Sequence, residues 1–201
     1  EGAQGLSGLG VSMGRKIPVR IGLDGGLGRG GLRPGQPALE FARAVGDLPG
    51  IEIVGLMYYG GLIYHQKDRA AMEEITRKEQ KELVETANLL RENGFPIRVL
   101  SGGTSFSGKM PQLLEGITEI RSGHYIFNDC GQLFSGFATE EDCALRVVLS
   151  VVSIVDDHHA ILDAGTKILT SDGCERHPGY GYVIGHPDMV ITALNEEHAF
   201  L

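Results

Sequence analysis

Short apolar runs alternate with stretches of helical apolar spacing along residues 19–127. Val19–Asp24 is such a run and is closed by Gly25 and Gly26, which is typical of a buried strand that enters a loop. Alternation of strand and helix predicts a parallel sheet of the α/β class, whose functional loops follow the carboxyl ends of the strands. We expect strands at Val19–Asp24, Ile51–Met57, Ile97–Leu100 and Glu119–Phe127, and helices at Ala38–Val45 and Asp68–Asn93.

The stretch Asp68–Asn93 has the clearest helical period of the chain. Asn93-Gly94 is a stop signal. The predicted apolar face consists of Ala71, Ile75, Leu83, Ala87 and Leu90, and the predicted water-facing positions are Glu74, Lys78 and Glu82.

The pattern changes after Cys143 to apolar segments separated by short turns, which predicts an antiparallel module. The boundary between the two halves is expected within Phe137–Asp142. The expected strands of this module are Ala144–Val155, His159–Asp163, Tyr180–Ile184 and Met189–Asn195.

Composition narrows the classes of protein that the chain can belong to. Hydrophobic residues make up 42% and charged residues 22% of the chain, with 30 glycines, which is the composition of a globular protein rich in turns. The net charge of −8 without a basic run argues against a nucleic-acid surface. Apolar segments stay too short for a membrane span. Three irregularly spaced cysteines fit a reducing cytoplasm.

Both ends of the chain have the look of cut ends. Glu1 is not a start methionine, and the first residues carry no signal-peptide pattern. Phe200 and Leu201 close the chain without a polar tail. We therefore expect an internal piece of a longer protein.

The loop Gly26–Gly31 fits the spacing G-x-G-x-x-G, which in dinucleotide-binding proteins lets a pyrophosphate approach a helix start. That motif opens its helix directly, whereas Pro34, Gly35 and Pro37 intervene here. An NAD-binding protein is therefore a minor alternative, beside a glycine loop without a ligand.

The longer segment Asp24–Leu32 resembles the Asp-Thr-Gly-Met-Asn-Arg-Leu-Gly-Phe segment of alanine racemases and their relatives. In that family of pyridoxal-phosphate enzymes the arginine lies beside the cofactor, and Arg29 is the matching residue. A permanently charged, forked guanidinium suits the phenolic oxygen of the cofactor or a substrate carboxylate.

The segments Ser101–Thr104 and Arg121–Asp129 resemble the phosphate-binding parts of D-threonine aldolases and D-serine dehydratases. Small residues leave backbone N–H groups open to an anion, and hydroxyls add donors. In the wider fold an arginine near the second segment faces the pyridine nitrogen, which would leave that nitrogen unprotonated. The resemblance assigns the cofactor phosphate to Ser101, Gly102, Gly103 and Thr104 and to Gly123 and His124, with Tyr125 beside them, and assigns the pyridine nitrogen to Arg121.

The segment Gly55–Gly61 resembles the Gly-Leu-Met-x-Tyr-Glu-Gly-His segment of D-threonine aldolases, and Tyr59 matches the aromatic residue near the cofactor ring. Gly60 stands where the family has glutamate, and Leu62 stands where it has an acid/base histidine. His65 is a candidate substitute, against the simpler interpretation of a surface histidine.

The second half carries segments similar to the family's second domain, in Leu162–Asp172 and Leu194–His198. Its scattered histidines have no metal-ligand spacing, and Asp156–His159 is interpreted as the polar tip of a hairpin. In the resembled enzymes a divalent metal is held by residues downstream of the Glu-Glu-His segment, so its ligands are not in this chain.

No residue matches the lysine that holds the cofactor on the first barrel strand of the family. Lys109 follows the predicted phosphate loop, and Lys167 belongs to the antiparallel module, so neither is in the right context. We expect the chain by itself to be inactive and the full-length protein to be the enzyme.

The resemblance implies a partial TIM-type (β/α)8 barrel in residues 1–140, followed by part of an antiparallel β-domain in residues 141–201. The expected enzyme is a cytoplasmic, homodimeric pyridoxal-phosphate lyase that acts on D-amino acids, most like a D-threonine aldolase. A racemase, a D-serine dehydratase and a non-catalytic relative remain alternatives. Arg29 and Tyr59 are the expected catalytic residues.

Overall fold

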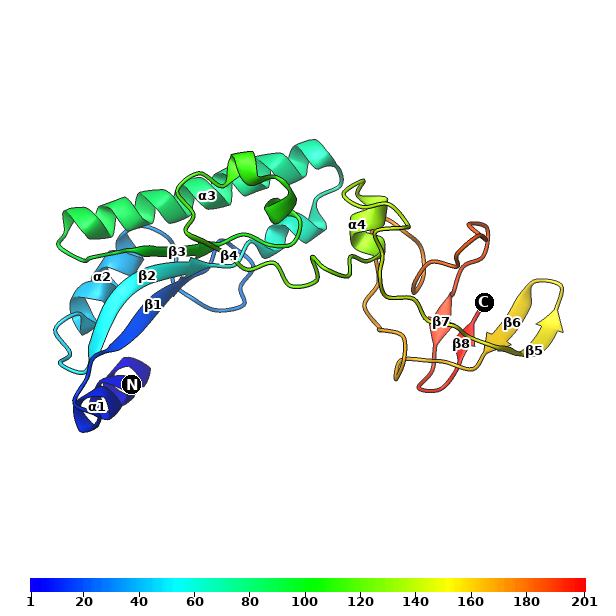
Figure 1. Ribbon diagram of the computed structural model, residues 1–201, viewed down its shortest axis with the longest axis horizontal. Helices are drawn as coiled ribbons and strands as arrows, with labels where there is room; N and C mark the ends of the chain where they lie inside the picture. Colours follow the sequence, from blue (N-terminus) through cyan, green and yellow to red (C-terminus); the bar gives the residue numbers. More distant parts are fainter. The chain divides into compact units, whose positions relative to one another are not determined.

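The computed structural model describes residues 1–201 and divides into two compact units, Glu1–Gly123 and His124–Leu201. The first unit holds a parallel sheet in which neighbours in sequence are neighbours in space, in the order β1-β2-β3-β4 (Figure 1). Its strands are β1 (Ile17–Leu23), β2 (Ile51–Tyr58), β3 (Val99–Gly102) and β4 (Glu119–Ile120). Its helices are α1 (Gly2–Ser12), α2 (Gln36–Val45) and α3 (Arg69–Glu92), with the short 3-10 helices η1 (Gly61–His65), η2 (Ser107–Lys109) and η3 (Pro111–Leu113).

The α/β fold class predicted from the sequence is confirmed. Helix α2 connects β1 to β2, and helix α3 connects β2 to β3, so each crossover joins adjacent parallel strands. The register aligns Ile21 with Leu56 and Leu56 with Leu100, which brings alternate apolar residues of three strands onto one face. Those residues form the core together with Leu39 of α2 and Leu83 of α3.

The opposite face of the sheet carries a different set of side chains, because successive strand residues point to opposite sides. Arg20 of β1, Ser101 of β3 and Glu119 of β4 lie on it and are joined to one another by hydrogen bonds. Met57 of β2 is 40% exposed there. One face is therefore apolar and covered by helices, and the other carries the charged cluster of Arg20 and Glu119 with Ser101, beside the exposed Met57.

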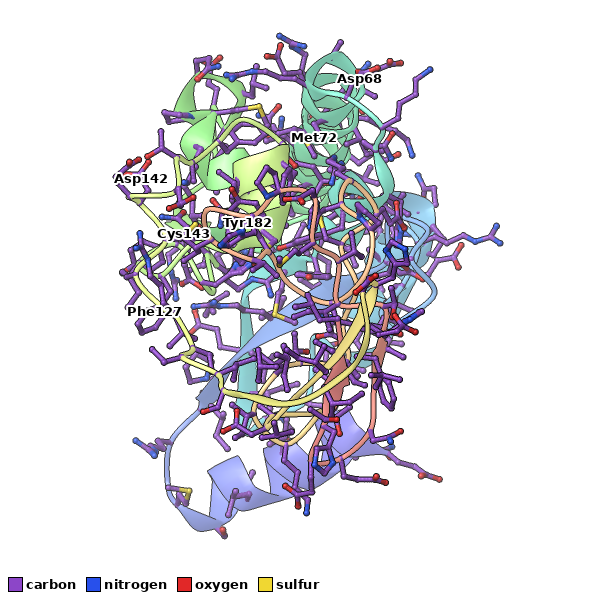
Figure 2. All side chains as sticks on the ribbon, turned by 90° about the vertical axis from the view of Figure 1, so that its right-hand side faces the viewer. Asp68, Met72, Phe127, Asp142, Cys143 and Tyr182 are labelled. Atoms are coloured by element: carbon purple, nitrogen blue, oxygen red, sulfur yellow. The ribbon has the colours of Figure 1, made fainter.

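Helix α3 begins and ends where the sequence predicts. The Asp68 side chain accepts a hydrogen bond from the Ala71 N–H at 2.9 Å and caps the first turn. Figure 2 shows Asp68 and Met72 at this end of the helix. Asn93 is the last cap residue, and Gly94 follows in the left-handed region at φ 87°.

The buried stripe of α3 differs from the predicted one over its first half. Ala71 and Ile75 are only partly buried, whereas Met72, Thr76 and Glu79 are buried. The prediction followed apolar residues alone and missed a stripe whose members include polar side chains. The buried positions are Met72, Thr76, Glu79, Leu83, Thr86, Ala87 and Leu90.

Helix α1 was not predicted, because its many glycines carry almost no apolar period. The structure gives a reason for the small residues. The Ser7 hydroxyl accepts a hydrogen bond from the Gly50 N–H at 3.0 Å. A Cβ on Gly10 would lie 2.0 Å from the Gly50 carbonyl oxygen, so the helix packs directly on backbone.

The second unit contains an antiparallel sheet in the order β5-β6-β8-β7, which confirms the predicted change of topology. Before the sheet, the Ala144 N–H donates to the Phe127 carbonyl at 2.8 Å, and the Asn128 amide donates to the Asp142 carbonyl at 2.8 Å. Phe127, Asp142 and Cys143 are labelled in Figure 2. The elements are α4 (Cys130–Phe134), β5 (Val151–Asp156), β6 (His159–Leu162), β7 (Ala193–Leu194) and β8 (Ala199–Phe200).

Several predicted strands are shorter than expected or absent. The strand expected at Glu119–Phe127 ends at Ile120, the one at Ala144–Val155 begins only at Val151, and the one at Met189–Asn195 is reduced to two residues. No strand forms at Tyr180–Ile184, where Gly179, Gly181 and Gly185 take positive φ angles and turn the chain. The apolar run Tyr180–Ile184, with Gly181 inside it and Gly179 and Gly185 beside it, was misread as a strand.

No helix in the chain combines the length and the apolar character that crossing a membrane requires.

Candidate active site

The loop after β1 is a closed turn that presents Arg29. Its two ends meet through hydrogen bonds from the Asp24 N–H to the Leu32 carbonyl at 2.8 Å and from the Leu32 N–H to the Gly22 carbonyl at 2.9 Å. The Asp24 carboxylate accepts from the N–H groups of Gly26 and Gly28 at 3.0 and 3.1 Å. The Asp24 side chain thus stabilises the turn of its own loop.

Arg29 packs on the aromatic ring of Tyr59, with its guanidinium carbon 3.9 Å from the ring centroid. Tyr59 follows directly after β2, so the contact joins the ends of two neighbouring strands. A cation over a tyrosine face at this distance is an attractive cation–π arrangement. The structure therefore brings together the two residues that the sequence predicts as catalytic.

Arg121, just beyond β4, reaches the same ring from another strand end. Its guanidinium carbon lies 5.9 Å from the Tyr59 centroid, and its Nη2 donates to the Tyr58 carbonyl at 2.8 Å. Its Nε is buried and has no hydrogen-bond partner. Burial lowers the pKa of Arg121, Glu119 opposes this effect, and the nearby charge of Arg29 adds to it. Two guanidiniums beside one ring, one with an unused donor, form a site that favours an anionic group.

The charged pair Arg20 and Glu119 lies near Arg121, on the sheet face opposite the apolar core. Arg20 donates two hydrogen bonds to the Glu119 carboxylate, at 2.5 and 2.9 Å, and the Ser101 hydroxyl donates a third at 2.8 Å. The hydrogen bonds from Arg20 and then Ser101 lower the pKa of Glu119. Glu119 is therefore an anion fixed between β1 and β3.

The loop Ser101–Thr104 is tight and largely self-satisfied. Gly103 has φ 74°, and the Thr104 N–H donates to the Ser107 hydroxyl at 2.7 Å. The Ser107 N–H in turn donates to the Thr104 hydroxyl at 3.2 Å. The Ser101 hydroxyl, bonded to Glu119, and the Thr104 N–H, bonded to Ser107, therefore both have internal partners.

The second predicted phosphate-binding segment is divided between the two units. Gly123 belongs to the first unit, and His124 and Tyr125 belong to the second. A Cβ on Gly123 would meet no atom within 4 Å, so open space surrounds it. The His124 ring lies 3.1 Å from the Asp129 carboxylate, and the Tyr125 side chain is 58% exposed.

Two acidic residues on the inner side of α3, the buried Glu79 and the half-buried Glu82, were missed by the sequence analysis. The Tyr58 hydroxyl donates to the Glu82 carboxylate at 2.7 Å, and Glu79 lies one turn before Glu82 on α3. Glu82 was expected to face water but holds this buried tyrosine. Helical spacing could have revealed Glu79, because positions 72, 76, 79 and 83 recur on one face of the helix.

The remaining candidates belong to other elements of the chain. His65 ends η1, and Lys109 ends η2. Lys167 pairs with Glu197. The predicted hairpin tip is confirmed, since β5 and β6 pair through Asp156 and His159, whose side chains lie 2.8 Å apart. The chain contains no group of three histidine, cysteine, aspartate or glutamate side chains placed to hold a metal ion.

Comparison with known proteins shows which family the chain resembles. The alanine racemase N-terminal domain matches residues 1–130, and a putative serine dehydratase domain matches residues 144–201. D-threonine aldolase from Arthrobacter sp. is 31% identical over 94% of the chain and 49% of its own length. D-threo-3-hydroxyaspartate dehydratase from Delftia sp. (strain HT23) is 30% identical over 99% of the chain and 55% of its own length.

A solved structure of a D-threo-3-hydroxyaspartate dehydratase variant in a metal-free form superposes with a TM-score of 0.85 at 28% identity. That match covers 99% of this chain and 55% of the dehydratase chain. The chain thus spans about half the length of the relatives that it matches.

The fold and the site define an α/β domain of the alanine racemase type. The chain belongs to the D-threonine aldolase and hydroxyaspartate dehydratase family of fold-type III pyridoxal-phosphate enzymes. Members of this family are lyases that depend on pyridoxal phosphate and act on small D-amino acids.

The residues at the strand ends fit that cofactor. The buried, unpartnered Nε of Arg121 can donate to a ring nitrogen or an anion, and Arg29 is held above Tyr59 beside it. Gly103 takes a left-handed φ of 74°, and a Cβ there would lie 3.2 Å from the Ser107 hydroxyl oxygen and 3.3 Å from Ile120. Positive charge and an unused donor are therefore present together at the strand ends of the sheet.

Proposed function

We propose that the full-length protein is a pyridoxal-phosphate-dependent lyase that acts on D-amino acids, most like a D-threonine aldolase that cleaves a β-hydroxy-D-amino acid to glycine and an aldehyde. The observation that carries this proposal is the convergence of Arg29 and Arg121 on the Tyr59 ring. Such a pair places two permanent positive charges beside an aromatic surface, which suits a flat, anionic cofactor.

Arg29, Tyr59 and Arg121 would hold the cofactor ring, and the backbone of Ser101–Thr104 and of Gly123 would hold its phosphate. In the second unit, His124 and Tyr125 are the residues that the family resemblance assigns to the phosphate. Pyridoxal phosphate, when bound, supplies an electron sink for the bond that breaks at the substrate Cα. Arg29 is fixed by Tyr59 and can orient either the phenolic oxygen or the substrate carboxylate. Arg121 cannot accept a proton, so it would keep a facing ring nitrogen unprotonated.

The aldolase branch is supported by the Gly55–Gly61 segment and by the D-threonine aldolase relative. A dehydratase, which expels the β-hydroxyl instead of breaking the Cα–Cβ bond, is supported by the hydroxyaspartate dehydratase relative. The two branches separate on their products, since only the aldolase releases glycine and an aldehyde. We also propose a divalent metal held by residues outside this chain, because the dehydratase relative has a form described as metal-free.

We further propose a cytoplasmic homodimer for the full-length protein. The mass of the purified protein in solution, measured over a range of concentrations, tests the dimer. A concentration-independent monomer would contradict it.

Binding of pyridoxamine 5′-phosphate to the full-length protein tests the cofactor assignment. This compound has no aldehyde, so its affinity reports the noncovalent cradle without a contribution from a lysine. We expect Arg29→Ala to weaken binding by about tenfold or more, the size of a lost charge-assisted contact. Arg33→Ala is the matched control, because Arg33 lies exposed just after the same loop. Tight binding of a nicotinamide dinucleotide without binding of pyridoxamine 5′-phosphate would refute the proposal.

A further inference from the structure

Glu79 is a buried acid that the proposed reaction does not use. It lies on the inner stripe of α3 and is 8% exposed. Its neighbouring charges on the helix are Lys78 and Glu82, and Glu82 accepts a hydrogen bond from Tyr58. Burying a carboxylate costs free energy, so its place requires an explanation.

The Glu79 carboxylate lies directly behind two loops of the candidate site. A Cβ built on Gly60 would be 2.2 Å from its Oε2, so the carboxylate occupies the space where a side chain at Gly60, the residue after Tyr59, would lie. It also lines a small cavity of about 10 Å³ together with Gly102, Gly103 and Ser107 of the serine loop. The same acid therefore borders both the ring-binding and the phosphate-binding segments.

The charges around Glu79 do not neutralise it. Burial, and then the neighbouring Glu82 carboxylate, raise the pKa of Glu79 to about 7, while Lys78 opposes this effect. Tyr58, at the end of β2, is the neighbour of Glu79 from the sheet. Its phenol stays protonated because burial, and then its hydrogen bond to Glu82, raise the pKa of Tyr58. The 3-10 helices packed against α3 carry His65 and Lys109. Glu79 can thus change its charge near neutral pH.

We propose that Glu79 couples anion binding at the serine loop to uptake of a proton, acting as a positioning residue that supports the loops when neutral and opposes a bound phosphate when ionised. The inference rests on the proposed function, since it requires the phosphate to lie at Ser101–Thr104. A carboxylate behind this loop repels a phosphate dianion across a medium that screens poorly. Binding and protonation therefore favour each other, as linkage requires.

The test is a calorimetric titration of the full-length protein with pyridoxamine 5′-phosphate in two buffers that differ in ionisation enthalpy. The number of protons taken up follows from the difference in heat. Wild type is expected to take up more protons than Glu79→Gln at slightly alkaline pH. Its affinity relative to that variant is expected to fall by up to about tenfold per pH unit above neutrality. Glu74→Gln, an exposed acid on the same helix, is the matched control and is expected to behave as wild type.

The outcomes separate the inference from the proposed function. Equal proton uptake and equal pH dependence in wild type and Glu79→Gln, with binding intact in both, would overturn the inference alone. Absence of binding in wild type would overturn the proposed function and the inference together. If Glu79→Gln does not fold, the carboxyl band of Glu79 in wild type can be titrated by infrared spectroscopy. A pKa that fails to rise on addition of the ligand then overturns the inference.

Discussion

The guanidinium of Arg29 lies 3.9 Å above the ring of Tyr59, although the two residues come from loops that follow different strands. Parallel strands bring their carboxyl ends to one edge, so residues separated by a helix in sequence become neighbours there. The contact fixes a long, otherwise mobile cation. It places a cation and an aromatic ring together at the edge where we propose that the cofactor binds.

Replacing the ring of Tyr59 is expected to release Arg29. Tyr59→Leu removes the aromatic face, whereas Tyr59→Phe keeps it, so only the first should weaken binding of pyridoxamine 5′-phosphate. The expected loss is about two- to thirtyfold, which corresponds to a cation–π contact of ~0.5–2 kcal/mol. Fluorescence titration of the full-length protein measures it. Equal affinity of the Leu and Phe variants would show that the ring does not hold the arginine.

The Tyr58 hydroxyl ties the sheet to α3 through its 2.7 Å hydrogen bond to Glu82. Tyr58→Phe leaves a partly buried carboxylate without this donor, and we expect the free energy of unfolding to fall by about 1–3 kcal/mol. Urea unfolding of wild type and variant gives the difference. Because Arg121 bonds to the Tyr58 carbonyl and not to its hydroxyl, binding of the ligand should change less than stability does. A loss of affinity without a loss of stability would contradict this division.

Gly25 has no room for a side chain. A Cβ there would lie 1.8 Å from the Tyr58 hydroxyl oxygen, so Gly25→Ala must displace either the loop or the tyrosine. We expect a loss of about 1–3 kcal/mol in unfolding free energy, together with weaker ligand binding, because the same loop carries Arg29. Gly8→Ala is the control, since a Cβ at that helical position meets nothing within 4 Å. A stable Gly25→Ala variant with normal affinity would refute the tight packing.

The sequence predicted the regular elements well wherever apolar spacing was strong. Helix α3 was placed to within a residue because its period, the cap Asp68 and the stop at Asn93 agree. The strands β1, β2 and β6 were likewise found because apolar residues fill them. Helix α1 escaped notice, since its glycines serve a close approach to Gly50 that no local pattern reveals.

The site was only partly predictable, for a physical reason. The motif resemblance singled out Arg29, Tyr59 and Arg121, and the structure brings them together. The buried position of Glu79 was not predicted, because apolar spacing does not show which polar residue of α3 turns inward. The bond from Ser101 to Glu119 depends on strand register, which the sequence alone does not specify.

Gly123 offers a direct test of the phosphate cradle. A Cβ there would meet no other atom of the protein within 4 Å, so we expect Gly123→Val to leave the unfolding free energy nearly unchanged. If the cofactor phosphate lies against this backbone, the valine should block it and weaken pyridoxamine 5′-phosphate binding by at least about tenfold. Gly173→Val, at another open glycine, controls for a general effect of the larger side chain. Unchanged affinity in Gly123→Val would remove Gly123 from the cradle.

The buried Glu79 should make the folded protein less stable as the pH rises toward neutrality. Its pKa is raised from 4.5 to about 7 on folding, so the folded state binds the proton more tightly than the unfolded state does. The resulting stabilisation is fully present below a pH of about 4.5 and is lost as the pH rises through about 7, by up to about 3 kcal/mol. Glu79→Gln has no such titration.

The measurement is the difference in unfolding free energy between Glu79→Gln and wild type, obtained from urea unfolding at mildly acid and at mildly alkaline pH. This difference should grow in favour of the variant as the pH rises. Glu85→Gln, an exposed acid on the same helix, should show almost no pH-dependent difference. If the Glu79→Gln difference were the same at both pH values, the carboxyl would titrate alike in the folded and unfolded states. Glu79 could then not link its proton to a ligand at the serine loop.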